Sequence, residues 1–77
     1  MKVEIVTGEH CSYCEGAKQI LKVRGIEYKE LSVMDKDGMK LMSEHNLRSV
    51  PQIFIDDKLI ENGYHGLQIW ALNDAGD

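Results

Sequence analysis

Cys11 and Cys14 stand at the junction between a strand-like run and a helical pattern, and they are the only cysteines in the chain. The run Val3–Val6 is rich in β-branched residues, which favours a strand. From Ser12 to about Arg24 the apolar residues recur at helical spacing, which predicts a helix. Two thiols three residues apart at such a junction are either a redox couple or half of a metal site.

The rest of the chain continues the alternation of strand and helix patterns. We expect a strand over 26–33, a helix over 35–46, strands over 52–55 and 58–61, and a helix over 65–73. Asp56 and Asp57 form a turn-like break, so the two short strands around them make an antiparallel hairpin. The order βαβαββα begins with a βαβ unit, which implies a parallel pair of strands and a right-handed crossover. A mixed four-stranded sheet with helices on its faces is therefore the expected architecture.

Each expected helix carries apolar residues on one side, and we assign these residues to the core. They are Cys14, Ala17, Ile20 and Leu21 in the first helix, Met39, Leu41 and Met42 in the second, and Leu67, Trp70 and Ala71 in the third. Asp35 is placed to cap the start of the second helix. Pro51 is the only proline, and it opens the third strand, where a proline is tolerated.

The composition limits the class of protein. The chain has 77 residues and no visible linker or repeat, which indicates a single domain over 1–77. The net charge is −4 and there is no basic run, which argues against nucleic-acid binding. No stretch approaches the roughly 20 apolar residues of a membrane span, and the start lacks the apolar core of a signal peptide. We expect a cytoplasmic location, where a cysteine pair is more often catalytic or metal-binding than structural.

The two cysteines have unequal chemical positions. Cys11 lies at a helix N-terminus, whose unpaired N–H groups and partial positive charge favour a thiolate. Such sites bring the pKa of a cysteine from about 8.5 to roughly 3.5–7.5. Cys14 lies one turn further into the helix, and we expect it to stay a thiol until it is needed. A protonated His10 favours the Cys11 thiolate, whereas the carboxylates of Glu9 and Glu15 oppose it.

Two other interpretations of the pair are weaker. Free cysteines are often buried as small hydrophobes, but a strand-to-helix junction is a poor place for burial. A zinc site needs four ligands, and only His10, His45 and His65 are available to complete one. No second Cys-x-x-Cys or His-x-x-x-His pattern accompanies the cysteines. We therefore expect no metal site.

Three motifs, in this order, resemble those of the glutaredoxin family. Cys11-Ser12-Tyr13-Cys14 is similar to the family's Cys-Pro-Tyr-Cys, and the segment Ser49–Ile55 is similar to its Thr-Val-Pro-x-Ile-Phe segment. The turn Asn62-Gly63-Tyr64 resembles the Gly-Gly turn before the family's last helix. The resemblance covers nearly the whole chain and implies an α/β fold, a thioredoxin-like three-layer sandwich.

The resemblance also implies a function. The chain is expected to be a glutathione-dependent thiol–disulfide oxidoreductase, with Cys11 as the nucleophile and Cys14 as the resolving thiol. It is expected to be a monomer with no tightly bound cofactor that uses glutathione as reductant and reduces protein disulfides, with ribonucleotide reductase as the family-level example. The alternatives are a glutaredoxin-like redoxin that thioredoxin reductase reduces, and a carrier of a metal or an iron–sulfur cluster.

The glutathione-binding positions of the family correspond to six residues of this chain: Tyr13, Val50, Pro51, Gly63, Tyr64 and His65. Val50–Pro51 corresponds to the family's cis peptide, which leaves the backbone groups of Val50 free to pair with the cysteinyl part of glutathione. Tyr13 corresponds to an aromatic flank of the groove. The N–H groups of Tyr64 and His65 are expected to hold the γ-glutamyl carboxylate, as helix N-termini hold anions.

Three positions depart from the family pattern. Gly8 stands where the family commonly has a lysine that attracts a carboxylate of glutathione. Ser12 replaces a proline that suits the first turn of a helix, and His65 stands where threonine, serine or aspartate is common. Arg48 and Lys58 are more simply explained as solvated surface cations than as replacements for the lysine. The departures bear on the affinity for glutathione more than on the thiol chemistry.

Overall fold

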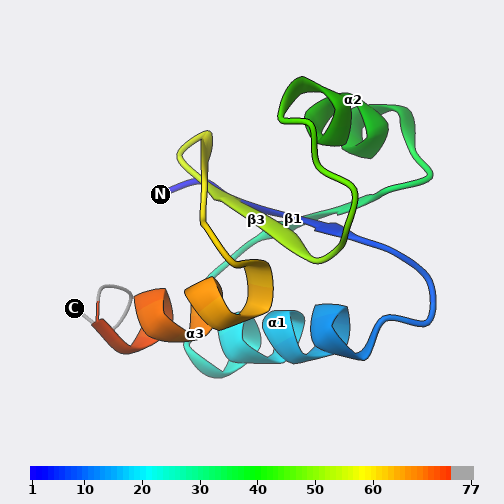
Figure 1. Ribbon diagram of the computed structural model, residues 1–77. Coiled ribbons are helices and arrows are strands. Elements are labelled where there is room, and N and C mark those ends of the chain that lie inside the picture. The colour runs from blue at the N-terminus through cyan, green and yellow to red at the C-terminus, as the bar shows by residue number, and fades with distance from the viewer. Residues whose placement is uncertain (74–77) are drawn as a thin grey trace.

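The computed structural model describes residues 1–73 and has the predicted order of elements. These are β1 (Val3–Thr7), α1 (Ser12–Val23), β2 (Lys29–Ser32), α2 (Lys36–Glu44), β3 (Gln52–Ile55), β4 (Lys58–Leu59) and α3 (Gly63–Asn73). Figure 1 shows three layers, in which α1 and α3 lie on one side of the sheet and α2 lies on the other. Among residues 1–73, no helix has the length and apolar character needed to cross a membrane.

The sheet is mixed, as predicted, with the strand order β2-β1-β3-β4. The parallel pair β1 and β2 places Thr7 opposite Ser32. The antiparallel pairs are β1 with β3 and β3 with β4. Asp56 and Asp57 form the hairpin turn with φ angles of 50° and 69°. Positive φ at both central residues is the requirement of the two-residue turn whose twist matches the twist of its strands.

Two strands are shorter than predicted. The second begins at Lys29 instead of residue 26, and the fourth ends at Leu59 instead of residue 61. Ile26, Tyr28 and Ile60 are half-buried and pack against the core beneath α1 and α3. Ile26 and Tyr28 therefore contribute to packing from the connection before β2, whereas Ile60 also donates its N–H to the carbonyl of Ile53 on β3 at 2.9 Å.

Two helix starts also differ from the prediction. Helix α3 begins at Gly63, two residues early, because the carbonyl of Asn62 accepts hydrogen bonds from the N–H groups of His65 at 3.1 Å and Gly66 at 3.3 Å. Asp35 occupies the N-cap position of α2, but its side chain makes no capping hydrogen bond. The prediction that this side chain caps the helix is therefore wrong.

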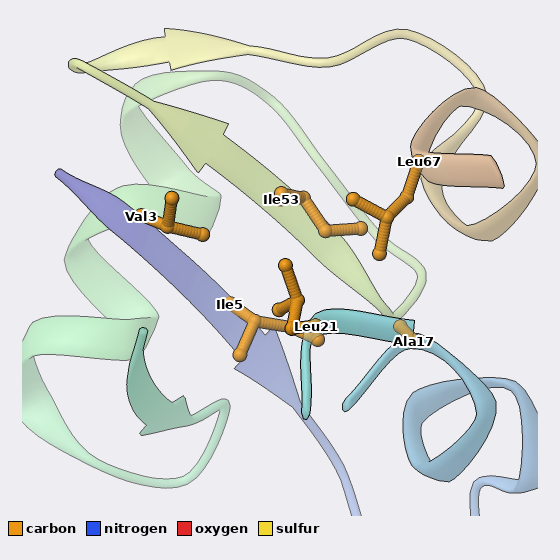
Figure 2. Close-up of a cluster of buried hydrophobic side chains, with 6 residues drawn as sticks. All are labelled: Val3, Ile5, Ala17, Leu21, Ile53 and Leu67. Carbon is orange, nitrogen blue, oxygen red and sulfur yellow. The ribbon is translucent and has the colours of Figure 1, made fainter. Parts of the chain in front are cut away.

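The core has one cluster on each face of the sheet, because successive residues of a strand point to opposite faces. The cluster beneath α1 and α3 consists of Val3, Ile5, Ala17, Leu21, Ile53 and Leu67 (Figure 2). The cluster beneath α2 consists of Val6, Leu31, Met42 and Phe54. Met39 is 52% exposed, so its predicted place in the core is wrong. Both clusters include residues of β1 and β3. They therefore hold these two strands in place, and the candidate site lies next to their ends.

Candidate functional site

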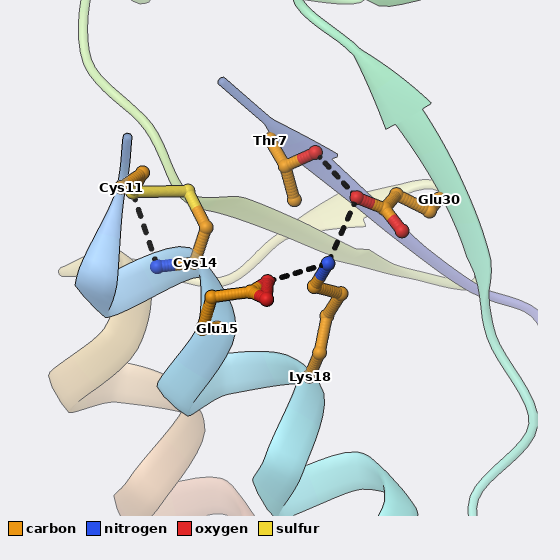
Figure 3. A network of polar contacts seen from close by, with 6 residues as sticks. All are labelled: Thr7, Cys11, Cys14, Glu15, Lys18 and Glu30. Atoms are coloured by element: carbon orange, nitrogen blue, oxygen red, sulfur yellow. Dashed lines mark hydrogen bonds and ion pairs between the residues drawn. A yellow bond between two sulfur atoms is a disulfide. The ribbon is translucent and has the colours of Figure 1, made fainter. Parts of the chain in front are cut away.

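Cys11 and Cys14 are joined by a disulfide, with Cα atoms 5.2 Å apart. Cys11 is the N-cap residue of α1 and has an extended backbone, with φ −114° and ψ 101°. The backbone N–H of Cys14 donates a hydrogen bond to Sγ of Cys11 over 3.1 Å (Figure 3). The sulfur thus takes the place of the usual capping oxygen, and a thiolate at this position would receive the same donor.

The two sulfurs differ in accessibility. Cys11 is half-buried, whereas only 2% of Cys14 is exposed. A disulfide-bonded substrate can therefore reach Cys11 but not Cys14. Within residues 1–73, the structure has no group of three or more His, Cys, Asp or Glu side chains arranged to hold a metal ion.

Val50 lies beside the disulfide. Its carbonyl oxygen is 3.9 Å from Sγ of Cys11, and its peptide bond to Pro51 is cis, as the family resemblance implies. Val50 is half-buried and Pro51 is buried. The motif that contains Val50 and Pro51 therefore lies next to Cys11, although the two motifs are far apart in the sequence.

A groove of about 920 Å³ begins at Val50 and runs to the start of α3. Its lining includes all six residues that the resemblance assigned to glutathione binding, namely Tyr13, Val50, Pro51, Gly63, Tyr64 and His65. Other residues that were not predicted also line it, among them Leu47, Leu59, Ile60 and Glu61. They come from the connection before β3 and from the end of the hairpin, and no motif marked them. The volume is within the range of roughly 300–1,000 Å³ that is typical of small-molecule sites.

One wall of the groove is aromatic. The ring of Tyr13 lies 5.4 Å from that of Tyr64 and 6.4 Å from that of His65, between centroids. The Tyr64 hydroxyl accepts a hydrogen bond from Gln68 at 3.2 Å. A β-carbon on Gly16 would come within 2.9 Å of the Tyr64 ring, so this glycine lets the ring pack against α1. The wall is therefore held by contacts between α1 and α3.

The start of α3 closes the far end of the groove. Gly63 has φ +48°, and a β-carbon there would come within 2.7 Å of the carbonyl oxygen of Pro51. Only a glycine fits this close approach. The N–H of His65 is bonded to Asn62, while those of Gly63 and Tyr64 have no backbone acceptor among residues 1–73. Of the predicted pair of donors, the N–H of Tyr64 thus has no backbone acceptor within residues 1–73, whereas the N–H of His65 is already bonded.

The groove carries little positive charge. Within the described part of the chain, residues 1–73, no lysine or arginine lines it, and its titratable side chains besides the two tyrosines are Glu61 and His65. Arg48 and Lys58 do not line the groove, in agreement with their interpretation as surface cations. A carboxylate bound in this groove would depend on backbone N–H groups and on the imidazole.

A second hollow lies on the other side of Cys11. It has a volume of about 520 Å³ and is lined by Gly8, His10, Cys11, Ser12 and Glu15. The residues His10 and Glu15 that were expected to influence the thiolate thus lie in the same hollow as Cys11.

A polar network begins next to this hollow (Figure 3). The Lys18 ammonium lies 2.6 Å from a carboxylate oxygen of Glu15 and 3.2 Å from one of Glu30. The hydroxyl of Thr7 donates to the same Glu30 oxygen over 2.7 Å. The Thr7 hydroxyl and then Lys18 hold the pKa of Glu30 below its usual value, and Glu15 and then Glu30 raise the pKa of Lys18. The spacing of Glu15 and Lys18 was visible in the sequence, but the contact with Glu30 was not.

Comparison with known proteins gives one family. Residues 3–60 match the family model described as glutaredoxin. The chain is 38% identical over 78 residues to a probable glutaredoxin of Synechocystis sp., covering 97% of this chain and 85% of the relative. It is 41% identical over 59 residues to glutaredoxin 3 of Escherichia coli, covering 70% of this chain and 68% of the relative.

A solved structure has the same fold. Glutaredoxin 1 from Francisella tularensis, complexed with cacodylate, matches with a TM-score of 0.80 and 33% identity over 99% of this chain and 98% of that one. The predicted thioredoxin-like sandwich is therefore confirmed.

Proposed function

Because the chain belongs to the glutaredoxin family and carries its redox pair at Cys11 and Cys14, we propose that it is a glutathione-dependent thiol–disulfide oxidoreductase. The observation that carries the proposal is the place of the accessible sulfur. Cys11 lies 3.9 Å from the carbonyl oxygen of Val50, where a groove begins that is lined by all six positions assigned to glutathione.

The unequal burial of the two cysteines supports different roles for them. The Cys11 thiolate attacks a substrate disulfide, forms a mixed disulfide and releases one substrate thiolate. Cys14 then attacks the Cys11 sulfur, releases the second substrate thiol and closes the intramolecular disulfide. One glutathione thiolate opens that bond by forming a mixed disulfide on Cys11, and a second glutathione removes the first as oxidised glutathione. The N–H of Cys14 stabilises negative charge on Cys11 whenever that sulfur is the leaving group.

The groove supports one orientation of glutathione. Its cysteinyl sulfur lies at Cys11, and its backbone pairs with Val50 in the manner of an added strand. Tyr13 flanks the tripeptide. The γ-glutamyl carboxylate lies at the first turn of α3, where the N–H groups of Gly63 and Tyr64 have no backbone acceptor among the residues that the structure describes.

A second candidate is a redoxin of the same fold that thioredoxin reductase reduces. It is favoured by the charge of the groove, which no lysine or arginine lines, and by Gly8 in place of the family's lysine. Glutathione carries two carboxylates, and a groove with little positive charge gains less binding free energy from them than a groove with a lysine would. The two candidates share the chemistry of Cys11 and differ only in the electron donor.

The remaining expectations belong to the same proposal. The chain acts as a single domain over 1–77 and as a monomer in the cytoplasm, without a tightly bound cofactor. Its substrates are disulfides of proteins, with ribonucleotide reductase as the family-level example. It binds neither nucleic acid nor a membrane.

The reductant decides between the two candidates. The oxidised protein is incubated with NADPH and either glutathione with glutathione reductase or thioredoxin reductase alone, and NADPH consumption with hydroxyethyl disulfide is followed. Turnover with glutathione supports the main proposal, and turnover only with thioredoxin reductase supports the second. In either system Cys11→Ser abolishes activity, whereas Cys14→Ser with oxidised glutathione gains about 305 Da on Cys11, because no resolving thiol remains.

A further inference from the structure

We propose that Lys18 is a positioning residue that holds the carboxylate of Glu15 away from Cys11, and that it thereby sets how readily the Cys11 thiolate forms. The proposal rests on thiol exchange at Cys11, which is part of the proposed function, and it holds for either reductant. It concerns two charged groups near Cys11, namely the carboxylate of Glu15 and the ammonium of Lys18 that binds it.

Glu15 lies in the first turn of α1, one turn after Cys11. It lines the same hollow as Cys11, and its N–H donates to the carbonyl of Cys11 at 3.2 Å. A carboxylate turned toward Cys11 would disfavour its thiolate through like-charge repulsion. Among residues 1–73, the other titratable side chain that lines this hollow with Cys11 and Glu15 is that of His10. Cys11 also meets the uncharged carbonyl of Val50, and among the residues that the structure describes no lysine or arginine lines the hollow.

Lys18 binds the carboxylate of Glu15. Figure 3 shows its ammonium between the carboxylates of Glu15 and Glu30, with the contact to Glu15 at 2.6 Å. The Lys18 side chain is only 20% exposed, whereas that of Glu15 is 70% exposed. The cation is therefore the fixed member of the pair. An isolated pair of exposed charges contributes little, but here two carboxylates share the ammonium of Lys18.

Lys18 is itself held by residues outside its helix. Glu30 lies on β2 and accepts the hydroxyl of Thr7, which is the last residue of β1 and only 6% exposed. The loop that leads to Cys11 starts directly after Thr7. The network thus ties α1 to the two strands beneath the reactive cysteine, and Glu15 can turn toward Cys11 only by leaving Lys18.

The sign of the effect follows from the charges. Without Lys18, Glu15 and Glu30 lose their shared cation, and Glu15 is free to face Cys11. The thiolate is then less stable. Since the disulfide form has no charge on either sulfur, the reduced form alone is destabilised, and the disulfide becomes harder to reduce.

The test uses Lys18→Gln in the otherwise intact chain. The reduced protein is alkylated with iodoacetamide as a function of pH, which reports Cys11 because Cys14 is only 2% exposed. We expect the midpoint of alkylation to rise by roughly 0.5–1 pH unit. We also expect the equilibrium constant for reduction by dithiothreitol at neutral pH to fall by about three- to tenfold. Lys36→Gln, an exposed lysine of α2 on the opposite side of the sheet, is the matched control and should leave both values unchanged.

Three further measurements separate this role from a purely structural one. Lys18→Arg should restore the wild-type midpoint, and Lys18→Gln combined with Glu15→Gln should return most of the way to it. In 1 M salt, where the screening length is about 3 Å, the shift in Lys18→Gln should shrink. A folded Lys18→Gln with the wild-type midpoint overturns the proposal, and so does a shift that persists in the double variant and in 1 M salt.

Glu15→Gln alone provides a test that does not depend on how well Lys18→Gln folds. Because Lys18 already neutralises Glu15, we expect this variant to lower the midpoint by less than about 0.3 pH unit. A decrease of about one pH unit would mean that Glu15 acts on Cys11 without compensation, and it would overturn the proposal.

Discussion

The carbonyl oxygen of Val50 lies 3.9 Å from Sγ of Cys11, although 39 residues separate the two in the sequence. This contact lies between the groove that includes Val50 and the smaller hollow that includes Cys11. Gly8 also lies close to this contact, because a β-carbon on Gly8 would come 3.1 Å from Cγ2 of Val50. A substrate at Cys11 therefore meets residues from three separate segments of the chain.

Gly8→Lys should strengthen glutathione binding. The substitution places a cation at the junction of Cys11 and Val50, where the family commonly has one, and no lysine or arginine lines the groove to compete with it. We expect the KM for glutathione to fall by about two- to fivefold, the gain typical of an exposed ion pair. The measurement is the glutathione dependence of hydroxyethyl disulfide reduction at low and high salt, and the gain should decrease at high salt.

Gly8→Ala is the matched control for that substitution. It adds the same β-carbon, to which the half-buried Val50 side chain must yield by a few tenths of an ångström, but it adds no charge. Its KM should stay at or above the wild-type value. If alanine and lysine lower the KM equally, charge is not the cause, and the account of the groove as poor in cations is wrong.

Tyr13→Ala should impair use of glutathione without affecting stability. Tyr13 is 59% exposed, so its removal leaves the core intact, but its ring packs 5.4 Å from Tyr64 along the groove. Loss of the apolar surface that the ring presents to the tripeptide should raise the KM for glutathione by about two- to tenfold, equivalent to about 0.5–1.5 kcal/mol of binding free energy. Reduction by dithiothreitol, which needs no groove, serves as the internal control, together with Tyr13→Phe. An unchanged KM in Tyr13→Ala would remove this residue from the binding site.

Gly38→Ala should destabilise the fold, although alanine is the better helix former by roughly 1 kcal/mol. Gly38 is buried in α2, and a β-carbon there would collide with the backbone carbonyl of Ser32 at the end of β2. To relieve the collision, the backbone of α2 or of β2 would have to move. We therefore expect a net loss of about 1–3 kcal/mol in the free energy of unfolding. Urea denaturation measures it. Ser43→Ala, at an exposed position of the same helix, should be neutral or slightly stabilising, and equal effects of the two variants would contradict the collision.

Gly38 also shows what the sequence could and could not predict. A glycine within a helical pattern lowers helix propensity, and the sequence spacing does not reveal that Gly38 approaches the backbone of Ser32. The order of elements was predictable, since it depends on local periodicity and turn chemistry. The glutathione positions could be assigned only through the family motifs, because Val50 and Cys11 lie on different elements and no local pattern brings them together.

Contacts between elements account for the features that the sequence analysis missed. Lys18 and Glu30 stand 12 residues apart, and their contact depends on how α1 crosses the sheet. Met39 was expected in the core because its spacing fits an apolar helix face, yet it is 52% exposed, and Met42 contributes to the core beneath α2. In both cases the outcome was decided by the angle at which a helix packs, which the sequence pattern leaves open.

Glu30→Gln should make the stability of the protein less sensitive to acid. The Thr7 hydroxyl and Lys18 lower the pKa of Glu30 in the folded state. The charged form therefore adds stability above the unfolded pKa of about 4.3, and this stability is lost as the pH falls through the lower folded pKa. Since the Glu30 side chain is 43% exposed, the contribution at pH 7 should be less than about 1 kcal/mol.

The measurement for Glu30→Gln is the urea midpoint from pH 7 down to pH 2. Glutamine keeps an oxygen that can accept the hydroxyl of Thr7, so the variant removes the charge and not the hydrogen-bonding position. Wild type and variant should differ most near neutral pH and converge below the folded pKa of Glu30, because the wild-type carboxyl is then neutral too. Glu27→Gln, at an exposed position in the connection before β2, is the control and should follow the wild-type curve. A constant difference across the whole range would show that Glu30 stabilises the fold through packing and not through its charge.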